Sequence, residues 1–343
     1  MSFAVNVKQY ETPLKVEMGD TILQTALNGG REYPHGCQSG NCGACKSRLY
    51  SGDIQMSPYS EYALTQEEKD SGLILACRAV PWSDCEVAYL EQDEIVAHPL
   101  RELNCLVTDL ERMTHDITRV QLSIETGGPF DFSSGQYSQI TFKGLTPRDY
   151  SMANLSGNNL LEFHIREISG GKISKFVNKN LKIGDAVEVK GPYGISYYRH
   201  KHTGPILAIA GSTGLAPIKS IIEKALEENA KRRIYLYIGV RDTPDLYLIE
   251  HFNMLMKNHP ALSLNIILSE PKKGVEYRKG YLADAIANDF DNLNQTKVYL
   301  AGPPIMVETC INQLRKIGVQ DENCHADAFY TEADKALMAE EYE

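Results

Sequence analysis

The sequence predicts a multidomain chain that joins a small α+β module, an antiparallel β-barrel and a parallel α/β sheet. With 343 residues, the chain is long enough for two or three domains. Its start holds a cysteine-rich loop between short strands, its middle holds short strands with turn signals, and its last third alternates apolar strands with helices. These patterns place domains at residues 1–93, 101–200 and 203–330, followed by an acidic tail at 331–343.

Composition and charge exclude several classes of protein. No run approaches the ~18 apolar residues of a transmembrane helix, and the start lacks a signal-peptide pattern, so we expect a cytoplasmic monomer without a membrane anchor. Residues 1–93 hold 7 Lys/Arg against 13 Asp/Glu, within a total net charge of −10. Nucleic-acid binding needs the opposite sign, so we expect none. The acidic module either steers a basic protein partner or simply keeps the chain in solution.

The first module begins with alternating apolar and polar residues, which predict a hairpin within residues 3–30. A helix should follow, capped by Asp20 and ended by Gly29 after Leu27. A short strand at Cys85–Tyr89 should close the module. The cysteine-rich loop lies between these elements.

Four of the eight cysteines are spaced as ligands of an iron–sulfur cluster. Cys37, Cys42, Cys45 and Cys77 form the pattern C-x₄-C-x₂-C…C, which is typical of plant-type [2Fe–2S] clusters. A zinc site prefers paired C-x₂-C units, so the unequal spacing favours the cluster. The loop also contains three glycines, which can take up positive φ and so let the backbone wrap closely around a cluster: Gly36, Gly40 and Gly43. The remaining cysteines are expected to be buried small hydrophobes, namely Cys85, Cys105, Cys310 and Cys324.

The middle segment reads as short strands, such as Gln139–Phe142 and Leu161–Ile165, and this spacing predicts an antiparallel barrel. The block Arg148-Asp-Tyr150-Ser151 follows one of these strands. An arginine can hold phosphate oxygens with two hydrogen bonds, a tyrosine can cover an aromatic ring face, and a serine hydroxyl can reach a ring nitrogen. These residue types suit a flavin.

A pair of glycines precedes a predicted helix start in the stretch Gly170-Gly171-Lys172-Ile-Ser174. Backbone N–H groups at a helix start can bind a pyrophosphate. Taken separately, this stretch and the Arg148 block are each compatible with an ordinary turn or strand end. Together and in this order they indicate a flavin site.

The last third predicts a parallel α/β sheet. Strands are expected at 206–210, 234–240, 264–268 and 298–301, and helices near 216–230, 245–258, 281–290 and 304–317. Glycine turns follow the first and last strands, at Gly211–Gly214 and Gly302-Pro303. Such sheets bind ligands at the carboxyl ends of their strands, so we expect a nucleotide there, although the usual G-x-G-x-x-G is absent.

These three blocks, in this order, resemble the ferredoxin reductase superfamily, and more narrowly the reductase components of bacterial ring-hydroxylating dioxygenases of the naphthalene dioxygenase type. The resemblance covers nearly the whole chain. It implies a β-grasp [2Fe–2S] ferredoxin domain, an antiparallel β-barrel FAD domain and a Rossmann-like parallel α/β NAD domain. The matching blocks include Cys37–Cys45, Arg148–Asn154, Phe163–Arg166, Gly191–Gly194, His202–Pro205, Gly211–Pro217, Gly239–Arg241 and Ala326–Phe329.

The same resemblance implies where the flavin binds. Arg148 would hold phosphate, Tyr150 would lie against the isoalloxazine ring, and Ser151 would lie near its N5 atom. Phe329 or Tyr330 would lie near the flavin face that the nicotinamide uses, so Tyr150, Ser151 and Phe329 are the expected catalytic residues. Further FAD contacts are implied at His164, Ile165, Gly171, Lys172 and Ser174.

NADH rather than NADPH is expected from charge. Relatives that use NADPH commonly place Ser-Arg after the third strand of this domain to hold the 2′-phosphate, where this chain has Ser269-Glu270. A carboxylate repels a phosphate and accepts from ribose hydroxyls, and Asp245 and Tyr247 suit the adenosine side. Nearby cations argue the other way, at Arg241, Lys272 and Lys273. The implied NAD contacts are Gly211, Thr213, Gly214, Arg241, Glu270, Gly302 and Pro303.

Some positions depart from the family pattern. Ser212 stands where relatives often have a second glycine, and Ala301 stands where they have a cysteine beside the nicotinamide–flavin contact. Hydride transfer needs no thiol, so the implied function is kept and no role for that cysteine carries over. The tail is longer than expected for the family, and Thr331 and Asp334 resemble a capping pair that predicts a short helix.

The resemblance implies a reductase that passes electrons from NADH to FAD, then to the [2Fe–2S] cluster, and then to a Rieske-type terminal oxygenase or a separate ferredoxin. The flavin is needed because NADH gives two electrons together while the cluster accepts one. A diiron monooxygenase hydroxylase or a deoxysugar dehydrase is an alternative partner, since those reductases share the domain order. A redox sensor without turnover is the other alternative, and the complete set of hydride-transfer motifs argues against it.

Overall fold

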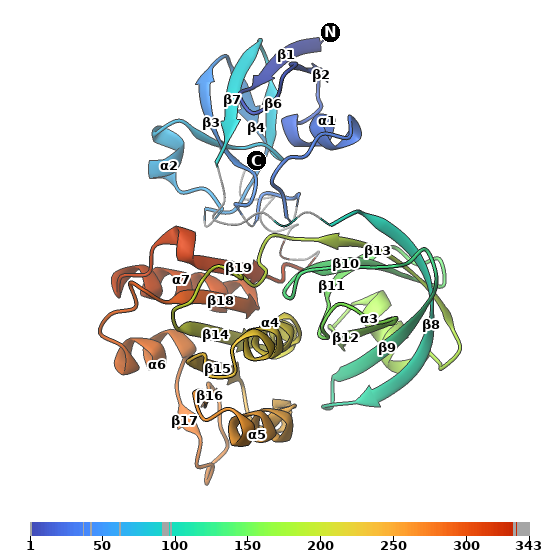
Figure 1. Ribbon diagram of the computed structural model, residues 1–343, viewed down its shortest axis with the longest axis vertical. Helices are drawn as coiled ribbons and strands as arrows, with labels where there is room; N and C mark the ends of the chain where they lie inside the picture. The colour runs from blue at the N-terminus through green and yellow to red at the C-terminus, as the bar shows by residue number, and fades with distance from the viewer. Residues whose placement is uncertain are drawn as a thin grey trace. The chain divides into compact units, whose positions relative to one another are not determined.

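The computed structural model divides the chain into two compact units (Figure 1). One unit holds Met1–Asp93 and Tyr330–Glu343, and the other holds Glu94–Phe329. No helix in the described part of the chain is both long and apolar enough to cross a membrane. The structure describes residues 2–36, 38–41, 43–61, 63–90, 96, 98–331 and 334.

The smaller unit is built on a five-stranded mixed sheet. Its elements are β1 (Ser2–Val7), β2 (Leu14–Glu17), α1 (Ile22–Asn28), β3 (Lys46–Ser51), β4 (Ile54–Met56), α2 (Gln66–Asp70), β5 (Leu73–Leu75), β6 (Ala79–Pro81) and β7 (Cys85–Tyr89). The sheet order is β2-β1-β7-β3-β5, with β1 parallel to β7 and antiparallel to β2, and β4 pairs with β6. Period-2 alternation along β1 and β2 buries Val5, Val7 and Val16 in one core with Ile22 of α1.

The predicted hairpin, helix and closing strand of this unit are confirmed. The predicted cap of α1 is wrong by one residue, because Thr21 rather than Asp20 accepts the N–H of Gln24, at 3.2 Å. Asp20 instead completes the turn after β2, where its N–H donates to Glu17 O at 3.0 Å. The helix ends at Gly29, as predicted.

The first half of the larger unit is a nearly closed antiparallel barrel. Its elements are β8 (Arg101–Arg112), β9 (Ile117–Thr126), β10 (Tyr137–Phe142), β11 (Arg148–Ser151), β12 (Leu160–Arg166), α3 (Lys172–Lys179) and β13 (Ala186–Tyr193). The sheet order is β11-β10-β13-β8-β9-β12. The two edge strands meet through the bridge Met152–Phe163 and the hydrogen bond from Ala153 N to Glu162 O, at 2.8 Å. The predicted barrel is confirmed.

The second half of the larger unit is a parallel α/β sheet, as predicted, and it has six strands rather than the four expected. Its strands are β14 (Ile206–Gly211), β15 (Ile234–Val240), β16 (Leu262–Leu268), β17 (Arg278–Lys279), β18 (Lys297–Gly302) and β19 (Cys324–Ala328). Its helices are α4 (Leu215–Glu228), α5 (Ile249–Asn258), α6 (Leu282–Asp289) and α7 (Pro304–Lys316). The strand order is β17-β16-β15-β14-β18-β19. The chain therefore leaves β14 in one direction and returns on its other side at β18, which creates a switch point at the carboxyl ends of these strands.

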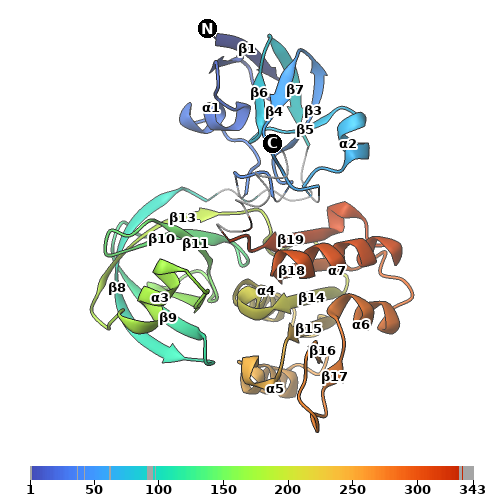
Figure 2. The same ribbon diagram turned by 180° about the vertical axis from the view of Figure 1, so that it is seen from behind.

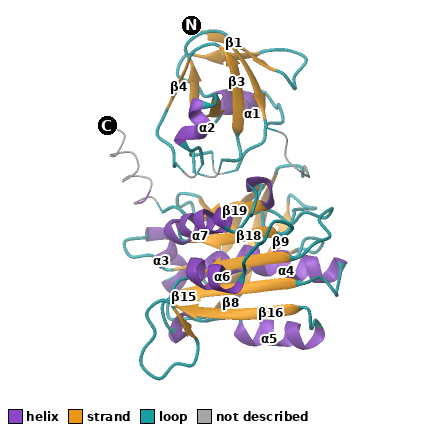
Figure 3. Ribbon diagram, turned by 90° about the vertical axis from the view of Figure 1, so that its left-hand side faces the viewer, coloured by secondary structure: helices purple, strands orange, loops and turns teal. Residues whose placement is uncertain are grey.

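Helices cover both faces of this sheet. Alternate residues of β14 enter different cores, with Ile206 and Ala208 among residues of α4 and α5, and Leu207 and Ile209 among residues of α6 and α7. Figures 1 and 2 show α4 and α5 between the sheet and the barrel, and Figure 3 shows α6 and α7 on the opposite face. A strand buried on both faces reads as the continuous apolar run seen in the sequence.

The boundaries of one helix differ from the prediction. The helix expected at 245–258 begins at Ile249, because Thr243–Asp245 form a separate 3₁₀ turn that is capped by Asp242. The outer strands β17 and β19 have no counterpart in the sequence prediction. They lie at the sheet edges, and β19 has no fully buried residue, so neither carries the apolar run that marks an inner strand.

Candidate functional site

The cysteine-rich loop of the smaller unit brings two predicted cluster ligands together. Cys45 and Cys77 are buried, and the backbone N–H of Cys77 donates to Cys45 Sγ at 3.4 Å. Cys37 and Cys42 lie outside the described residues. Backbone donors aimed at sulfur tune the reduction potential of iron–sulfur clusters. The described part of the loop therefore fits the cluster that the spacing predicts.

Glycines let this loop pack closely on the segment that follows it. Gly40 and Gly43 have φ of +81° and +70°, as predicted. A Cβ atom on Gly40 would lie 2.9 Å from Tyr59 Cβ, and one on Gly43 would lie 2.9 Å from Ala63 O. Positive φ and the close approach of neighbouring atoms, from side chains at Gly40 and from backbone at Gly43, both favour glycine at these positions.

The predicted flavin residues lie where the barrel opens. Strands β11 and β12 meet at the Met152–Phe163 bridge, and in the described residues no further ladder joins Ser151 to His164. An unpaired strand edge presents backbone N–H and C=O groups. Backbone N–H and C=O groups beside the Arg148–Ser151 strand are therefore left outside the strand ladder between β11 and β12.

The side chains of this strand have distinct surroundings. Arg148 is partly buried, and its Nη1 donates to Pro147 O at 2.9 Å. The ring of Tyr150 meets Phe142 edge-on, with centroids 6.4 Å apart. Burial raises the pKa of Tyr150 well above its usual range, so its phenol stays protonated. Ser151 is buried, and its Oγ donates to Asp327 Oδ2 at 3.4 Å.

Asp327 is a site residue that the sequence prediction missed. It lies on β19 opposite Ala301, and its carboxylate accepts from Ser151 of the barrel. Two residues later, the N–H of Phe329 donates to Gly302 O at 2.9 Å. The signal available in the sequence was the polar residue inside the Ala326–Phe329 block. Strand β19 thus brings Asp327 and the predicted Phe329 to the carboxyl end of the sheet, beside the flavin strand.

His164 and Ile165, which are predicted FAD contacts, have side chains that are used inside the protein. Ile165 packs in the barrel core. His164 is buried, with Nε2 3.2 Å from Glu162 Oε1 and Nδ1 3.2 Å from Tyr247 Oη. Tyr247, expected on the adenosine side, is itself buried in this contact. Only the backbone of these β12 residues is left for a cofactor.

The glycine stretch before α3 forms the predicted helix start. Gly171 is the N-terminal cap and makes no side-chain cap, so the first N–H groups of α3, including those of Lys172 and Ser174, lack helical partners. The N–H of Gly171 itself donates to Ile168 O at 2.9 Å. Of the three predicted pyrophosphate donors, the backbone N–H groups of Lys172 and Ser174 remain available. The N–H of Gly171 is used in the turn. The Ser174 hydroxyl accepts from Ile168 N at 3.1 Å.

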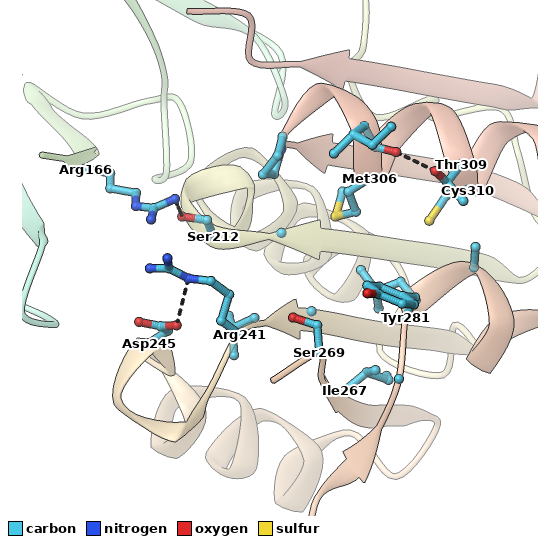
Figure 4. Close-up of a pocket in the computed structure, with 18 of the residues that line it drawn as sticks. Arg166, Ser212, Arg241, Asp245, Ile267, Ser269, Tyr281, Met306, Thr309 and Cys310 are labelled. Atoms are coloured by element: carbon cyan, nitrogen blue, oxygen red, sulfur yellow. Dashed lines mark hydrogen bonds and ion pairs between the residues drawn. The ribbon is translucent and has the colours of Figure 1, made fainter. Parts of the chain in front are cut away.

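A cavity of about 680 Å³ lies at the carboxyl ends of the parallel strands (Figure 4). This volume is typical of small-molecule sites. Of the predicted NAD residues, Gly211, Arg241 and Pro303 line it. Ser269 also lines it, whereas Glu270 is exposed and lies outside the lining. The sequence assigned Glu270 to the ribose hydroxyls. In the structure Asp245, rather than Glu270, offers a carboxylate in the cavity lining.

Charged side chains approach the cavity from the barrel and from the sheet (Figure 4). Arg166 Nε donates to Asp116 Oδ2 at 2.7 Å, and Arg241 Nε lies 3.6 Å from Asp245 Oδ2. Burial alone would raise the pKa of Asp116, but its hydrogen bonds, chiefly from Arg166, outweigh burial and hold the pKa below its ordinary value. Guanidinium groups suit a pyrophosphate, and carboxylates suit ribose hydroxyls. The cavity therefore carries both kinds of group that a dinucleotide needs.

The glycine turns pack directly against each other at this switch point. A Cβ atom on Gly214 would lie 2.0 Å from Ala301 O, and one on Gly302 would lie 2.7 Å from Gly211 O. Thr213 belongs to the 3₁₀ turn Ser212–Gly214 between them. Ser212 has φ of +52°, a conformation that suits glycine better. This explains why a glycine fits the position where the chain departs from the family pattern.

Gly302→Ala is expected to weaken NADH binding while FAD and cluster contents stay unchanged. Gly302 has φ of +145°, which is strained for any other residue, and its new methyl group would press on the Gly211 backbone. We expect the KM for NADH to rise at least about tenfold, the effect of ~1.4 kcal/mol. Gly274→Ala is the control, since it also has positive φ but no atom within 4 Å of its Cβ position. An unchanged KM in Gly302→Ala would contradict the assignment.

Comparison with protein families assigns each part of the chain. Residues 5–81 match the 2Fe-2S iron-sulfur cluster binding domain, residues 104–198 match the oxidoreductase FAD-binding domain, and residues 208–311 match the oxidoreductase NAD-binding domain. The three predicted cofactor classes are confirmed at the level of domains.

Curated relatives and solved structures match along nearly the whole chain. The reductase component of the naphthalene 1,2-dioxygenase/salicylate 5-hydroxylase systems of Ralstonia sp. is 38% identical over 317 residues, 92% of this chain and 95% of that protein. The reductase component of phenol 2-monooxygenase from Pseudomonas sp. strain CF600 is 34% identical over 343 residues, 98% of this chain and 97% of that protein. The ferredoxin reductase in carbazole 1,9a-dioxygenase has a TM-score of 0.70 at 26% identity, covering 96% of this chain and 99% of that chain.

Proposed function

Because this chain belongs to the ferredoxin reductase family with an N-terminal [2Fe–2S] domain, we propose that it is the NADH-dependent reductase of a Rieske-type ring-hydroxylating dioxygenase. The general class to which this proposal belongs is that of flavin and iron–sulfur NAD(P)H oxidoreductases of multicomponent oxygenase systems.

The observation that carries the proposal is the meeting of the flavin strand with the carboxyl end of the nucleotide sheet. Ser151 contacts Asp327, and Phe329 is held by the backbone of Gly302, which packs on Gly211 of the cavity lining. When bound, FAD accepts a hydride from NADH and releases its electrons singly to the cluster. The chain's own residues would supply orientation: Ser151 and Tyr150 would face the flavin, and Phe329 would cover the nicotinamide side.

Asp327 gives the Ser151 hydroxyl a defined direction. A serine hydroxyl rotates freely unless an acceptor holds its proton, and the carboxylate oxygen at 3.4 Å is such an acceptor. The lone pairs of Ser151 Oγ are then left free of that bond and could accept from an N–H group of the flavin. Arg148 begins the same strand and would supply the cation that holds the flavin phosphates.

NADH selection is supported by the carboxylate of Asp245 in the cavity lining. We expect kcat/KM for NADH to exceed that for NADPH at least about fivefold, since repulsion of a 2′-phosphate by a nearby carboxylate costs ~1 kcal/mol or more. Asp245→Asn should reduce this ratio, measured by steady-state flavin-dependent ferricyanide reduction with each cofactor. Glu270→Gln, at an exposed position outside the lining, is the control and should leave the ratio unchanged. A wild-type preference for NADPH would refute NADH selection.

The dioxygenase partner is supported by the 38% identity to the naphthalene dioxygenase-type reductase component. The phenol 2-monooxygenase relative aligns over 98% of this chain and favours a hydroxylase component as the second candidate. The test is NADH-driven reduction of a purified Rieske oxygenase, its separate ferredoxin, and a diiron hydroxylase. Faster reduction of the diiron protein would favour the monooxygenase alternative, and absence of turnover with cytochrome c would favour a sensor.

A further inference from the structure

A buried polar seam joins helix α4 to the barrel within the larger unit. Lys219 Nζ donates to Ala153 O at 2.9 Å, and Ser220 Oγ donates to Asn154 O at 2.8 Å. Lys219 is 8% exposed and Ser220 is fully buried. Two neighbouring side chains of one helix thus hold two consecutive carbonyl groups of the barrel.

The charge of Lys219 is balanced inside this seam. Its Nζ lies 3.4 Å from Glu162 Oε1 of β12 and 3.2 Å from Glu223 Oε1, one turn further along α4. A buried ammonium is tolerated only when it is paired and hydrogen-bonded. Burial alone would raise the pKa of Glu162, but the hydrogen bond from His164 and the charge of Lys219 outweigh it and hold that pKa well below its usual range. The carboxylate is therefore charged at neutral pH.

A second contact crosses the seam beside the first. Burial lowers the pKa of His164 below its ordinary value despite the Glu162 contact, so the ring is neutral at pH 7. The Glu162 carboxylate can only accept, which places the ring proton on Nε2 and leaves Nδ1 to accept from the Tyr247 hydroxyl at 3.2 Å. Tyr247 lies two residues before α5. Both helices on the barrel side of the sheet therefore contact β12, α4 through Lys219 and Glu162 and α5 through Tyr247 and His164.

The seam lies between the two cofactor sites. Ala153 and Asn154 lie two and three residues beyond Ser151, the end of the strand that carries Tyr150 and Ser151. Helix α4 directly follows the nucleotide turn Ser212–Gly214. Any shift of α4 relative to the barrel would move the nicotinamide relative to the flavin.

We propose that Lys219 and Ser220 are positioning residues for hydride transfer, which hold the flavin strand at a set distance from the nucleotide turn. This inference rests on the proposed function, because it concerns the same pair of sites. Misplacement of reacting atoms by about 1 Å can cost on the order of a hundredfold in rate. Two hydrogen bonds to consecutive carbonyls restrict such movement more tightly than apolar packing, because hydrogen bonds are directional.

The test uses the full chain loaded with FAD and cluster. Ser220→Ala removes one bond, and Lys219→Met removes the other bond and the charge. Lys224→Met is the matched control, since Lys224 lies on the same helix, is only partly buried, and pairs with Glu227 and Glu228 rather than with the barrel carbonyls. Anaerobic stopped-flow mixing with NADH measures the rate constant of flavin bleaching and the long-wavelength charge-transfer absorbance that reports nicotinamide–flavin stacking. Hydrogen exchange at the Ala153 amide, which donates to Glu162 O, gives a readout independent of activity.

We expect the bleaching rate constant to fall several-fold in Ser220→Ala and roughly tenfold or more in Lys219→Met. The charge-transfer absorbance should weaken, the Ala153 amide should exchange faster, and the Kd for NAD⁺ should stay within about twofold. Lys224→Met should match wild type in all four measurements. Ser220→Thr, which keeps the hydroxyl, should restore the rate in part.

Unchanged bleaching and charge-transfer absorbance in Ser220→Ala, with faster exchange or a lower Tm, would overturn the inference and reduce the seam to a purely structural contact. This holds even where Lys219→Met does not fold, because Ser220→Ala loses a single neutral hydrogen bond. Failure of the proposed function is a different result, in which wild type itself shows no flavin bleaching with NADH.

Discussion

Cys45→Ser is expected to remove the cluster and with it the one-electron output of the protein. A serine hydroxyl is far less acidic than a thiol, so it does not replace a thiolate ligand of iron. Cys45 is buried, and its Sγ accepts the backbone N–H of Cys77, so no other side chain can take its place without rearranging the loop. The visible absorbance of the cluster should disappear, and cytochrome c reduction by NADH should fall to background.

Reduction of ferricyanide should survive in this variant. Ferricyanide accepts electrons from a flavin directly, and the barrel and nucleotide sheet form a separate compact unit with cores of their own. This split between the two acceptors distinguishes cluster loss from general unfolding.

Cys85→Ser is the matched control for Cys45→Ser. Cys85 is buried in the same unit, and its Sγ donates to Ser83 O at 3.2 Å, a bond that a serine hydroxyl can also make. Burial raises the pKa of the Cys85 thiol above its ordinary value, which is unfavourable for a metal ligand. The cluster should be retained in Cys85→Ser. A full complement of cluster in Cys45→Ser would show that the spacing had been misread.

Arg148→Ala is expected to be purified with little FAD. A hydrogen bond to a charged group contributes about 1.5–3 kcal/mol, so losing the arginine should weaken FAD binding roughly ten- to hundredfold. NADH-driven reduction of both ferricyanide and cytochrome c should fall in proportion to the lost flavin. The measurements are the ratio of flavin absorbance to protein and a titration with added FAD, which should restore activity at high concentration.

A change of charge on the same barrel controls for the Arg148 variant. Lys190→Ala removes an exposed cation that pairs with Glu102 at 2.8 Å, and exposed pairs contribute little to stability. Its FAD content and activity should match wild type. If Arg148→Ala also keeps its flavin at full occupancy, the phosphate of FAD is bound elsewhere and the assignment fails.

Features that depend on residues close together in the sequence, such as a ligand spacing or an apolar run, were predicted well. The cysteine spacing is confined mostly to one loop, so the class of cofactor could be read without knowing the fold. The apolar runs of β14, β15 and β18 are buried on both faces of the sheet, and continuous apolar runs bounded by glycine turns are a strong local signal for such strands.

The surroundings of individual side chains could not be predicted, because residue type alone does not say which groups a side chain will face. His164 and Tyr247 carry groups suited to a cofactor, yet the fold turns them toward each other. Glu270 follows the expected strand but is exposed, while Asp245 on a 3₁₀ turn reaches the cavity lining. At the N-terminus, the turn after β2 uses Asp20 and leaves Thr21 as the helix cap.

The sequence by itself determined the cofactor classes, the order of the domains and the glycine turns, since each depends on spacing over a few residues or on local backbone conformation. The tertiary structure alone decided which distant groups meet. Ser151 and Asp327 are 176 residues apart, and Lys219 reaches a carbonyl 66 residues away. Such contacts form only when the barrel and the parallel sheet pack together. Packing buries these polar groups, and a buried polar group needs a hydrogen-bond partner, which only the fold can bring within reach.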